Sequence, residues 1–237
     1  MPLPTVNEVP KYTLTIPSTK QEVRYRPFLV KEQKVLLIAL ESQDEKQILS
    51  SIVDTIKSCV IDPIDPLSLA TFDVEYIFTR IRAKSAGETS KITVKCTECE
   101  IPNDYTVELD KIQIDVPKTD KNKIKLNENY TLTLKYPMYS HMVKTNLPED
   151  AGYSETLYYL TLGCLDSLQS EEENFNFADE SKEDVENFLE SLTNEQFDKI
   201  MEFVNEVPQL THDIKFKCTS CNHDNTHTLR GIQDFFS

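Results

Sequence analysis

Glycine is scarce in this sequence, which contains only Gly87, Gly152, Gly163 and Gly231 among its 237 residues. A P-loop and a dinucleotide-binding GxGxxG turn both need closely spaced glycines, because backbone N–H groups must approach phosphate. Neither pattern can be written with these four positions. The GxSxG and HExxH patterns of hydrolases and zinc proteases are missing as well. We therefore predict that the protein is not an enzyme and has no small-molecule substrate.

The sequence also lacks an apolar stretch near the roughly 20 residues that a membrane-spanning helix requires. Its start, MPLPTVNEVPKYTLTIP, does not combine a basic region with an apolar core as a signal peptide does. We expect the chain to be made and kept in a cytoplasm, without a membrane partner. Reduced thiols or metal ligands are then expected for the six cysteines. Two of them, Cys59 and Cys164, lie in apolar helical runs and are expected to be buried.

Positive charge is the third shortage, since 25 Lys and Arg accompany 40 Asp and Glu, for a formal net charge of −15. The imbalance lies between Glu149 and Glu206, where seventeen acidic residues accompany only Lys182 and Lys199. Acidic surfaces repel phosphate backbones, so nucleic-acid binding is not expected. Two interpretations of the acidic segment stay open: a solvated helical face, or a surface that docks onto a basic partner.

The first 90 residues have the pattern of a hairpin followed by helices. Residues 12–16 and 23–28 alternate apolar and polar side chains, and the intervening PSTK has turn chemistry. The run LVKEQKVLLIALES places Leu29, Leu36 and Leu40 on one broad helical stripe, which we expect to be buried. Two more helices are predicted over residues 44–60 and 68–86.

Short strands follow, and helices then return. The runs ITVKC, YTVEL, IQIDV, KIKL and YTLTLKY alternate, which predicts a small antiparallel sheet. Helices are expected near 138–145 and 155–168, and two more begin at capping sequences around Ser181 and Thr193. The fold class is therefore α+β, with helices packed on a small antiparallel sheet. Four regions are predicted: the hairpin and helices at 1–90, strands at 91–136, acidic helices at 137–207, and a segment at 208–237 that packs back on 91–136.

Four cysteines form two CxxC pairs, Cys96 with Cys99 and Cys218 with Cys221. Both pairs follow alternating runs, KITVKCTEC and HDIKFKCTSC, and both precede turn residues, as in zinc knuckles. Two knuckles supply the four thiolates that a closed, tetrahedral structural zinc site prefers. The gap of 118 residues between Cys99 and Cys218 exceeds the roughly 15–20 of familiar ribbons. We nevertheless predict one zinc-ribbon-like site in which all four cysteines bind a structural Zn²⁺.

Three alternatives to this site stay open. The pairs could be redox-active, although they are set in strand and turn sequence and not before the helix of a thioredoxin-like unit. Cys218 and Cys221 could instead bind zinc together with His223 and His227, which would leave the first pair without a role. The site could also hold no metal.

Two long stretches of the N-terminal part resemble a known family. PSTKQEVRYRPFLVKEQKVLLIALES, followed by FDVEYIFTRIRAKSAGETSKITVKC, is similar to the baseplate hub protein family of T4-like contractile-tailed bacteriophages. The likeness covers most of residues 1–100. It implies a late protein that is made in the host cytoplasm and acts in assembly of the central hub, with other baseplate and tail proteins as partners. Two outcomes stay open after assembly: the protein remains in the tail baseplate of the virion, or it leaves.

The residues and the resemblance together predict a structural or assembly protein that acts through protein–protein contacts. The RPFLVKEQK segment and the helix around residues 72–82 are candidates for contact surface, and the alternative is that both belong to the core. Two other functions stay open. One is a transient acidic chaperone or adaptor that is absent from the mature virion, and the other is a zinc-ribbon factor associated with nucleic acid.

Overall fold

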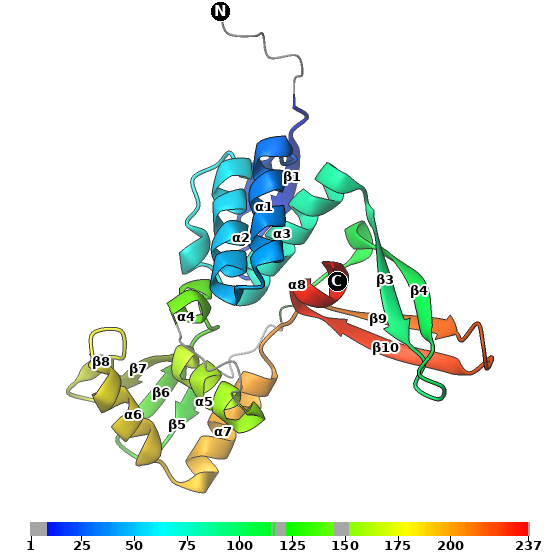
Figure 1. The fold of residues 1–237 in the computed structure, drawn as a ribbon. Helices are drawn as coiled ribbons and strands as arrows, with labels where there is room; N and C mark the ends of the chain where they lie inside the picture. Colours follow the sequence, from blue (N-terminus) through cyan, green and yellow to red (C-terminus); the bar gives the residue numbers. More distant parts are fainter. Residues whose placement is uncertain (1–8, 115, 117–121, 145–151, 237) are drawn as a thin grey trace, which may run out of the picture. The chain divides into compact units, whose positions relative to one another are not determined.

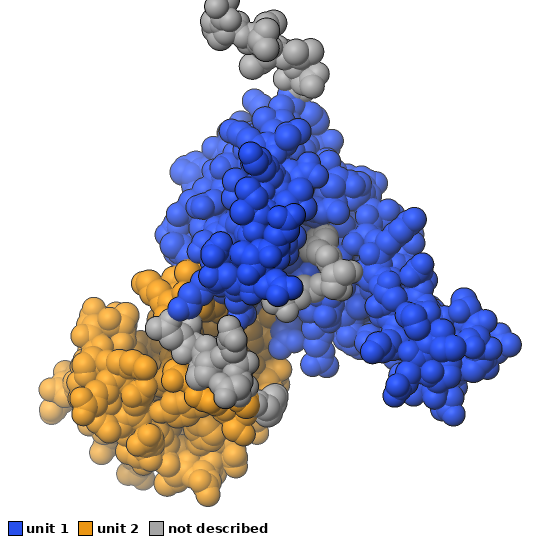
Figure 2. Space-filling view, viewed as in Figure 1, with its two compact units in different colours: residues 1–116, 209–237 blue, residues 117–208 orange. Residues whose placement is uncertain are grey.

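The computed structural model describes residues 9–114, 116, 122–144 and 152–236 (Figure 1). The chain divides into two compact units (Figure 2), of which unit 1 comprises residues 1–116 and 209–237 and unit 2 comprises residues 117–208. Unit 2 is therefore inserted between two parts of unit 1. Among the described residues, no helix combines the length and the apolar character needed to cross a membrane.

Unit 1 begins with the predicted hairpin, formed by β1 (Tyr12–Thr15) and β2 (Glu22–Tyr25) in antiparallel register. Its turn is fixed to α3 (Thr71–Ala86) by one buried carboxylate. Asp73 accepts hydrogen bonds from the backbone N–H of Ser18 at 2.9 Å and from its hydroxyl at 2.5 Å. The turn is thereby held against the start of the helix, and the carboxylate has the partners that burial demands.

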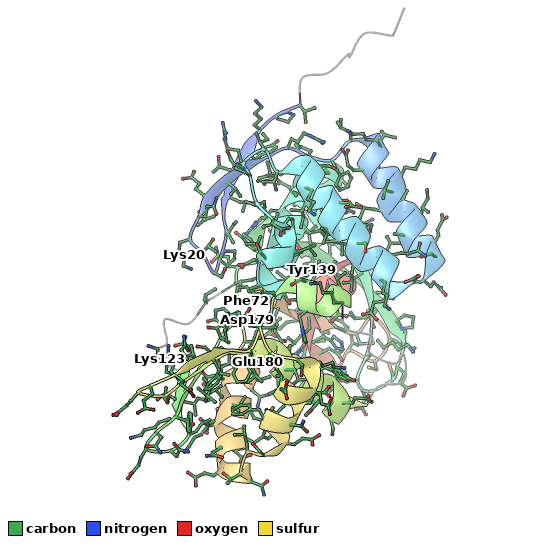
Figure 3. The ribbon with its side chains drawn as sticks, turned by 90° about the vertical axis from the view of Figure 1, so that its left-hand side faces the viewer. Lys20, Phe72, Lys123, Tyr139, Asp179 and Glu180 are labelled. Atoms are coloured by element: carbon green, nitrogen blue, oxygen red, sulfur yellow. The ribbon has the colours of Figure 1, made fainter. Side chains whose placement is uncertain are left out.

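Three helices follow the hairpin: α1 (Val30–Ser42), α2 (Glu45–Cys59) and α3, with a short 3₁₀ turn at Pro66–Ser68. Asp44 caps α2, because its side chain accepts hydrogen bonds from two backbone N–H groups in the first turn. Helix α3 is the centre of the packing, and Figure 3 marks Phe72 near its start. Its fully or almost fully buried apolar side chains include Phe72, Val74, Ile77 and Ile81.

Helix α1 differs from expectation, because its apolar stripe is not buried. Leu29 is 42% exposed and Leu40 is 53% exposed, whereas the buried residues of the helix are Glu32 and Ala39. A polar clamp holds the start of the helix instead. Arg26 donates to Glu32 at 2.9 Å, and Glu32 also accepts from the backbone N–H of Leu29 at 2.8 Å. The arginine of the RPF motif is therefore a structural residue, and the predicted burial of the stripe is wrong.

Two hairpins from distant parts of the sequence complete unit 1. They are β3 (Thr89–Lys95) with β4 (Pro102–Glu108), and β9 (Thr211–Lys217) with β10 (Asp224–Arg230). A 3₁₀ turn (Leu109–Lys111) follows β4, and α8 (Gly231–Phe236) follows β10. The two hairpins cross each other in Figure 1, and their buried residues belong to one hydrophobic core. Its members include Ile92, Val94, Val107, Leu109, Ile214, Leu229 and Phe235.

Unit 2 contains a four-stranded antiparallel sheet in the order β5-β6-β7-β8. The strands are β5 (Lys123–Lys125), β6 (Thr131–Leu134), β7 (Leu165–Gln169) and β8 (Asn174–Asn176). The region predicted as one set of strands, 91–136, is divided between the units, with residues 91–116 in unit 1 and residues 117–136 in unit 2. In unit 2, β6 pairs with β7 from later in the chain. Alternation identified strands in four of the five predicted runs but not their pairing partners. The prediction for IQIDV is wrong, because its described residues 112–114 and 116 form no strand.

The helices of unit 2 are α4 (Tyr139–Lys144), α5 (Tyr153–Cys164), α6 (Lys182–Glu190) and α7 (Asn194–Asn205). Both predicted caps are confirmed, since the Ser181 side chain accepts from a backbone N–H of α6 and Thr193 forms a capping box with Gln196. The helix expected over 155–168 ends at Cys164, and its remaining residues form β7. Tyr139, marked in Figure 3, is almost fully buried. Part of the helix expected over 138–145 and the start of the acidic segment lie outside the described residues.

One carboxylate of α3 lies where the chain returns to unit 1. Glu75 accepts a hydrogen bond from the backbone N–H of Leu210, and its Oε1 lies 3.5 Å from the position that a Cβ would take at Gly231. Burial raises the pKa of Glu75 from 4.5 to about 7. The folded protein therefore retains a proton on this carboxyl at a pH where an unfolded chain has released it.

We expect this proton to make the free energy of unfolding fall as the pH rises from about 4.5 to about 7, because the folded state binds more protons in that window. A pKa difference of one corresponds to about 1.4 kcal/mol, so the loss is on the order of 3 kcal/mol. Glu75→Gln should remove this component in urea unfolding between pH 4.5 and 8, whereas Glu22→Gln, at an exposed position, should not. A pH profile that Glu75→Gln leaves unchanged contradicts the assignment.

Candidate metal centre

The four cysteines of the two CxxC pairs converge in unit 1. The sulfurs of Cys96 and Cys221 are 3.7 Å apart, those of Cys99 and Cys218 are 3.6 Å apart, and all four lie within 4.8 Å of one another. A tetrahedral site with Zn–S bonds of about 2.3 Å has sulfurs about 3.8 Å apart. The separations therefore suit four ligands around a single ion, and this cluster can hold one.

Each pair sits in the turn of a hairpin, and the two turns have the same backbone geometry. We call residues 96–101 the first knuckle and residues 218–223 the second knuckle. The N–H of Glu100 donates to the carbonyl of Cys96 at 3.0 Å, and the N–H of Asn222 donates to that of Cys218 at 3.1 Å. Glu100 and Asn222 have φ values of 59° and 60°. This left-handed position turns the chain sharply, so that both sulfurs of a pair face the same point.

The second knuckle is connected to the first by the side chain of Asn225, a buried residue of β10. Its carbonyl oxygen accepts hydrogen bonds from the backbone N–H and from the hydroxyl of Thr97, both at 2.9 Å. Its amide nitrogen lies 3.5 Å from the sulfur of Cys96 and donates toward it. One side chain thus fixes the opposite turn and supports a ligand in it.

Asn103 of β4 makes the equivalent contacts from the first hairpin to the second knuckle. It accepts from the backbone N–H of Thr219 at 2.9 Å and from its hydroxyl at 3.0 Å, and its amide nitrogen lies 3.7 Å from the sulfur of Cys218. Each asparagine is the seventh residue after the first cysteine of its own knuckle. The centre therefore has an internal two-fold pattern. Sequence reasoning missed both asparagines, although their shared position was a usable signal.

Hydrogen bonds to sulfur favour ionisation of the first cysteine in each knuckle. Backbone N–H groups of Cys221 and Ser220 lower the pKa of Cys218 to about 6. The backbone N–H of Cys99 likewise lowers the pKa of Cys96. These two cysteines are also the buried ones of the four. The thiolate, which is the form that binds metals, therefore forms more readily at these two positions than at an ordinary cysteine.

The second cysteine of each knuckle behaves oppositely. The backbone N–H of His223 lowers the pKa of Cys221, but desolvation and the three neighbouring cysteine side chains outweigh it and raise the pKa to about 12. The pKa of Cys99 is also raised, in spite of a hydrogen bond from the backbone N–H of Ile101. Four thiolates this close together repel one another, which favours the protonated thiols. A bound divalent cation attracts the thiolates and favours the ionised form instead. The donor set therefore fits a cation.

The other sequence candidates lie apart from this centre. Within the described ranges, the cluster of possible metal ligands consists of the four cysteines, and neither His223 nor His227 belongs to it. Cys59 and Cys164 are completely buried, and burial raises their pKa values to about 11 and about 12. They are the inert, buried thiols that the sequence predicted.

Comparison with known proteins gives one family. The model of the family described as T4 bacteriophage base plate protein matches residues 9–237. That range contains both knuckles and the whole of unit 2. No curated protein and no solved structure matched the chain.

We expect Asn225→Ala to weaken Zn²⁺ binding by about 10- to 100-fold, as the loss of a group that orients a metal ligand generally does. The substitution removes the bonds to Thr97 and the donor to the Cys96 sulfur. Asn103→Ala should have a similar effect because of the two-fold pattern. Competition with a chromophoric chelator measures the affinity, and the exposed Asn129→Ala in unit 2 is the control. An affinity equal to that of the unmodified chain would show that the asparagines do not support the ligands.

Proposed function

The chain belongs to the T4 bacteriophage base plate protein family, and on that premise we propose that it is a structural component of the central hub of a contractile tail baseplate. It is assembled in the host cytoplasm, stays in the virion, acts through contacts with other baseplate and tail proteins, and catalyses no reaction. The observation that carries the proposal is the extent of the family match, residues 9–237, which includes both units.

The proposed cofactor is one structural Zn²⁺ held by Cys96, Cys99, Cys218 and Cys221. Structural zinc sites release roughly 10–16 kcal/mol on binding in small peptides, which is comparable to the roughly 5–15 kcal/mol that stabilise a whole domain. In this chain the ion would join two hairpins that the insertion of unit 2 separates. Its role is to fix the end of the chain in unit 1, and four cysteine ligands leave no open position for chemistry.

A transient acidic adaptor is the second candidate, and the surface of unit 2 favours it. Helices α6 and α7 present exposed carboxylates that include Glu183, Asp184, Glu195, Asp198 and Glu202. Within these two helices the opposing charges are only Lys182 and Lys199, and each of them forms an ion pair within its own helix. Such a face suits a basic protein partner. An adaptor would leave once that partner is assembled, whereas a hub component would stay.

Purified virions separate the two functions. We expect quantitative mass spectrometry to find the chain in a fixed ratio to other baseplate proteins, because a structural component is retained. Phage produced without this protein should lack complete baseplates in electron micrographs. Complete baseplates that contain no copy of the chain would contradict the hub proposal and support the adaptor.

We expect metal loss to loosen the end of the chain. Cys221→Ser, or treatment with a strong chelator, should expose the segment around β9 and β10 to limited proteolysis, because the two knuckles no longer share an ion. Ser220→Ala is the matched control, since the serine lies in the same knuckle and only its backbone N–H contacts a sulfur. Native mass spectra with and without chelator give the bound mass. A digestion pattern that stays the same after metal removal counts against the structural role.

A further inference from the structure

Unit 1 contains a groove that the metal centre does not use. Its volume is about 400 Å³, and it lies between α1, α2, the second half of α3, the start of β3 and α8. This size is within the range of sites that bind other molecules, about 300–1,000 Å³. Leu36, Leu37 and Leu40 of α1 form one wall, and Phe78 of α3 is also part of the lining.

Two leucines of this wall, Leu37 and Leu40, are exposed, whereas Leu36 is half-buried. Leu37 is 51% exposed and Leu40 is 53% exposed, and the neighbouring Ile38 is 54% exposed. Gln33, Leu36, Leu37 and Leu40 follow the spacing of one helix face, so the groove runs along α1. Contiguous exposed apolar side chains of this kind mark binding surfaces more often than single ones do.

The charge of the lining indicates the partner. Among the described lining residues there are two positive side chains, Arg82 and Lys91, and no negative one. The acidic excess of the sequence lies between Glu149 and Glu206, in unit 2, and is not shared by this groove. Lys91 is exposed, so its ammonium group is accessible from the groove. A carboxylate placed there would pair with it.

We propose that the groove binds an amphipathic helix of another baseplate protein, whose apolar face covers Leu37 and Leu40 and whose carboxylate pairs with Lys91. An elongated apolar groove beside a helix is the surface that such helices recognise. A second copy of the chain is a poor occupant, since a symmetric contact would bring two positive grooves together. The inference rests on the proposed function, and it adds the surface and the chemistry of the partner.

The test uses the full chain and two fluorescein-labelled helical peptides of roughly 18 residues, about 27 Å long. Both carry leucines at positions i, i+3, i+4 and i+7, and they differ only in having glutamates or lysines at the edge of that face. Because the chain is strongly acidic, non-specific attraction favours the lysine peptide. Anisotropy titrations should nevertheless show the glutamate peptide binding at least about tenfold more tightly, if the positive groove is the site.

Three variants locate the binding. Leu37→Glu should weaken binding of the glutamate peptide at least about tenfold. Lys91→Glu should remove the preference for glutamate over lysine. Ile61→Glu should change nothing, because it adds the same charge at a side chain that is 42% exposed and outside the groove. Circular dichroism checks that each variant is folded.

Several results would overturn the proposal. They are equal affinity for both peptides, tighter binding of the lysine peptide, no binding of either peptide, or an effect of Ile61→Glu as large as that of Leu37→Glu. Sedimentation that shows a dimer abolished by Leu37→Glu would assign the groove to a second copy instead. Because the readout is peptide affinity in the isolated chain, it is independent of whether virions contain the protein.

Discussion

The approach of four sulfurs to within 4.8 Å is the interaction on which unit 1 depends. Each hairpin beside it has only two strands, and a two-stranded hairpin is marginally stable by itself in water. The β3–β4 and β9–β10 hairpins become stable together, through a shared core and through asparagines that bind the opposite turn. The same closeness that joins the hairpins makes four ionised thiols repel one another, so a cation is the natural complement of this arrangement.

The remaining surfaces are those of a protein that works by contact. Helix α3 is buried in the core, the four sulfurs of the candidate metal centre lie close to one another, and the RPF arginine is used in a structural clamp. What faces outward is an apolar stripe on α1 in one unit and carboxylates on α6 and α7 in the other. A chain of the baseplate family with two such different surfaces can contact two chemically different partners.

Much of this structure could be predicted from local sequence, and the failures share one cause. The N-terminal hairpin, the caps at Asp44, Ser181 and Thr193, and the meeting of the CxxC pairs depend on short motifs whose geometry is nearly fixed. The burial of α1 and the pairing of β6 with β7 depend on which distant element lies alongside. Periodicity shows that a helix has an apolar face, but it does not show whether the same chain covers that face. Asn103 and Asn225 were missed because asparagine after a turn is common.

The placement of unit 2 inside unit 1 has a consequence for synthesis on the ribosome. Cys99 and Cys218 are 119 positions apart, so at roughly 5–20 residues per second the second pair emerges about 6–24 s after the first. Unit 2 is synthesised completely before unit 1 and can fold first. During that time the first knuckle has only its own two cysteines. A nascent chain that stops early therefore has an incomplete unit 1, which cellular proteases can distinguish from the full-length product.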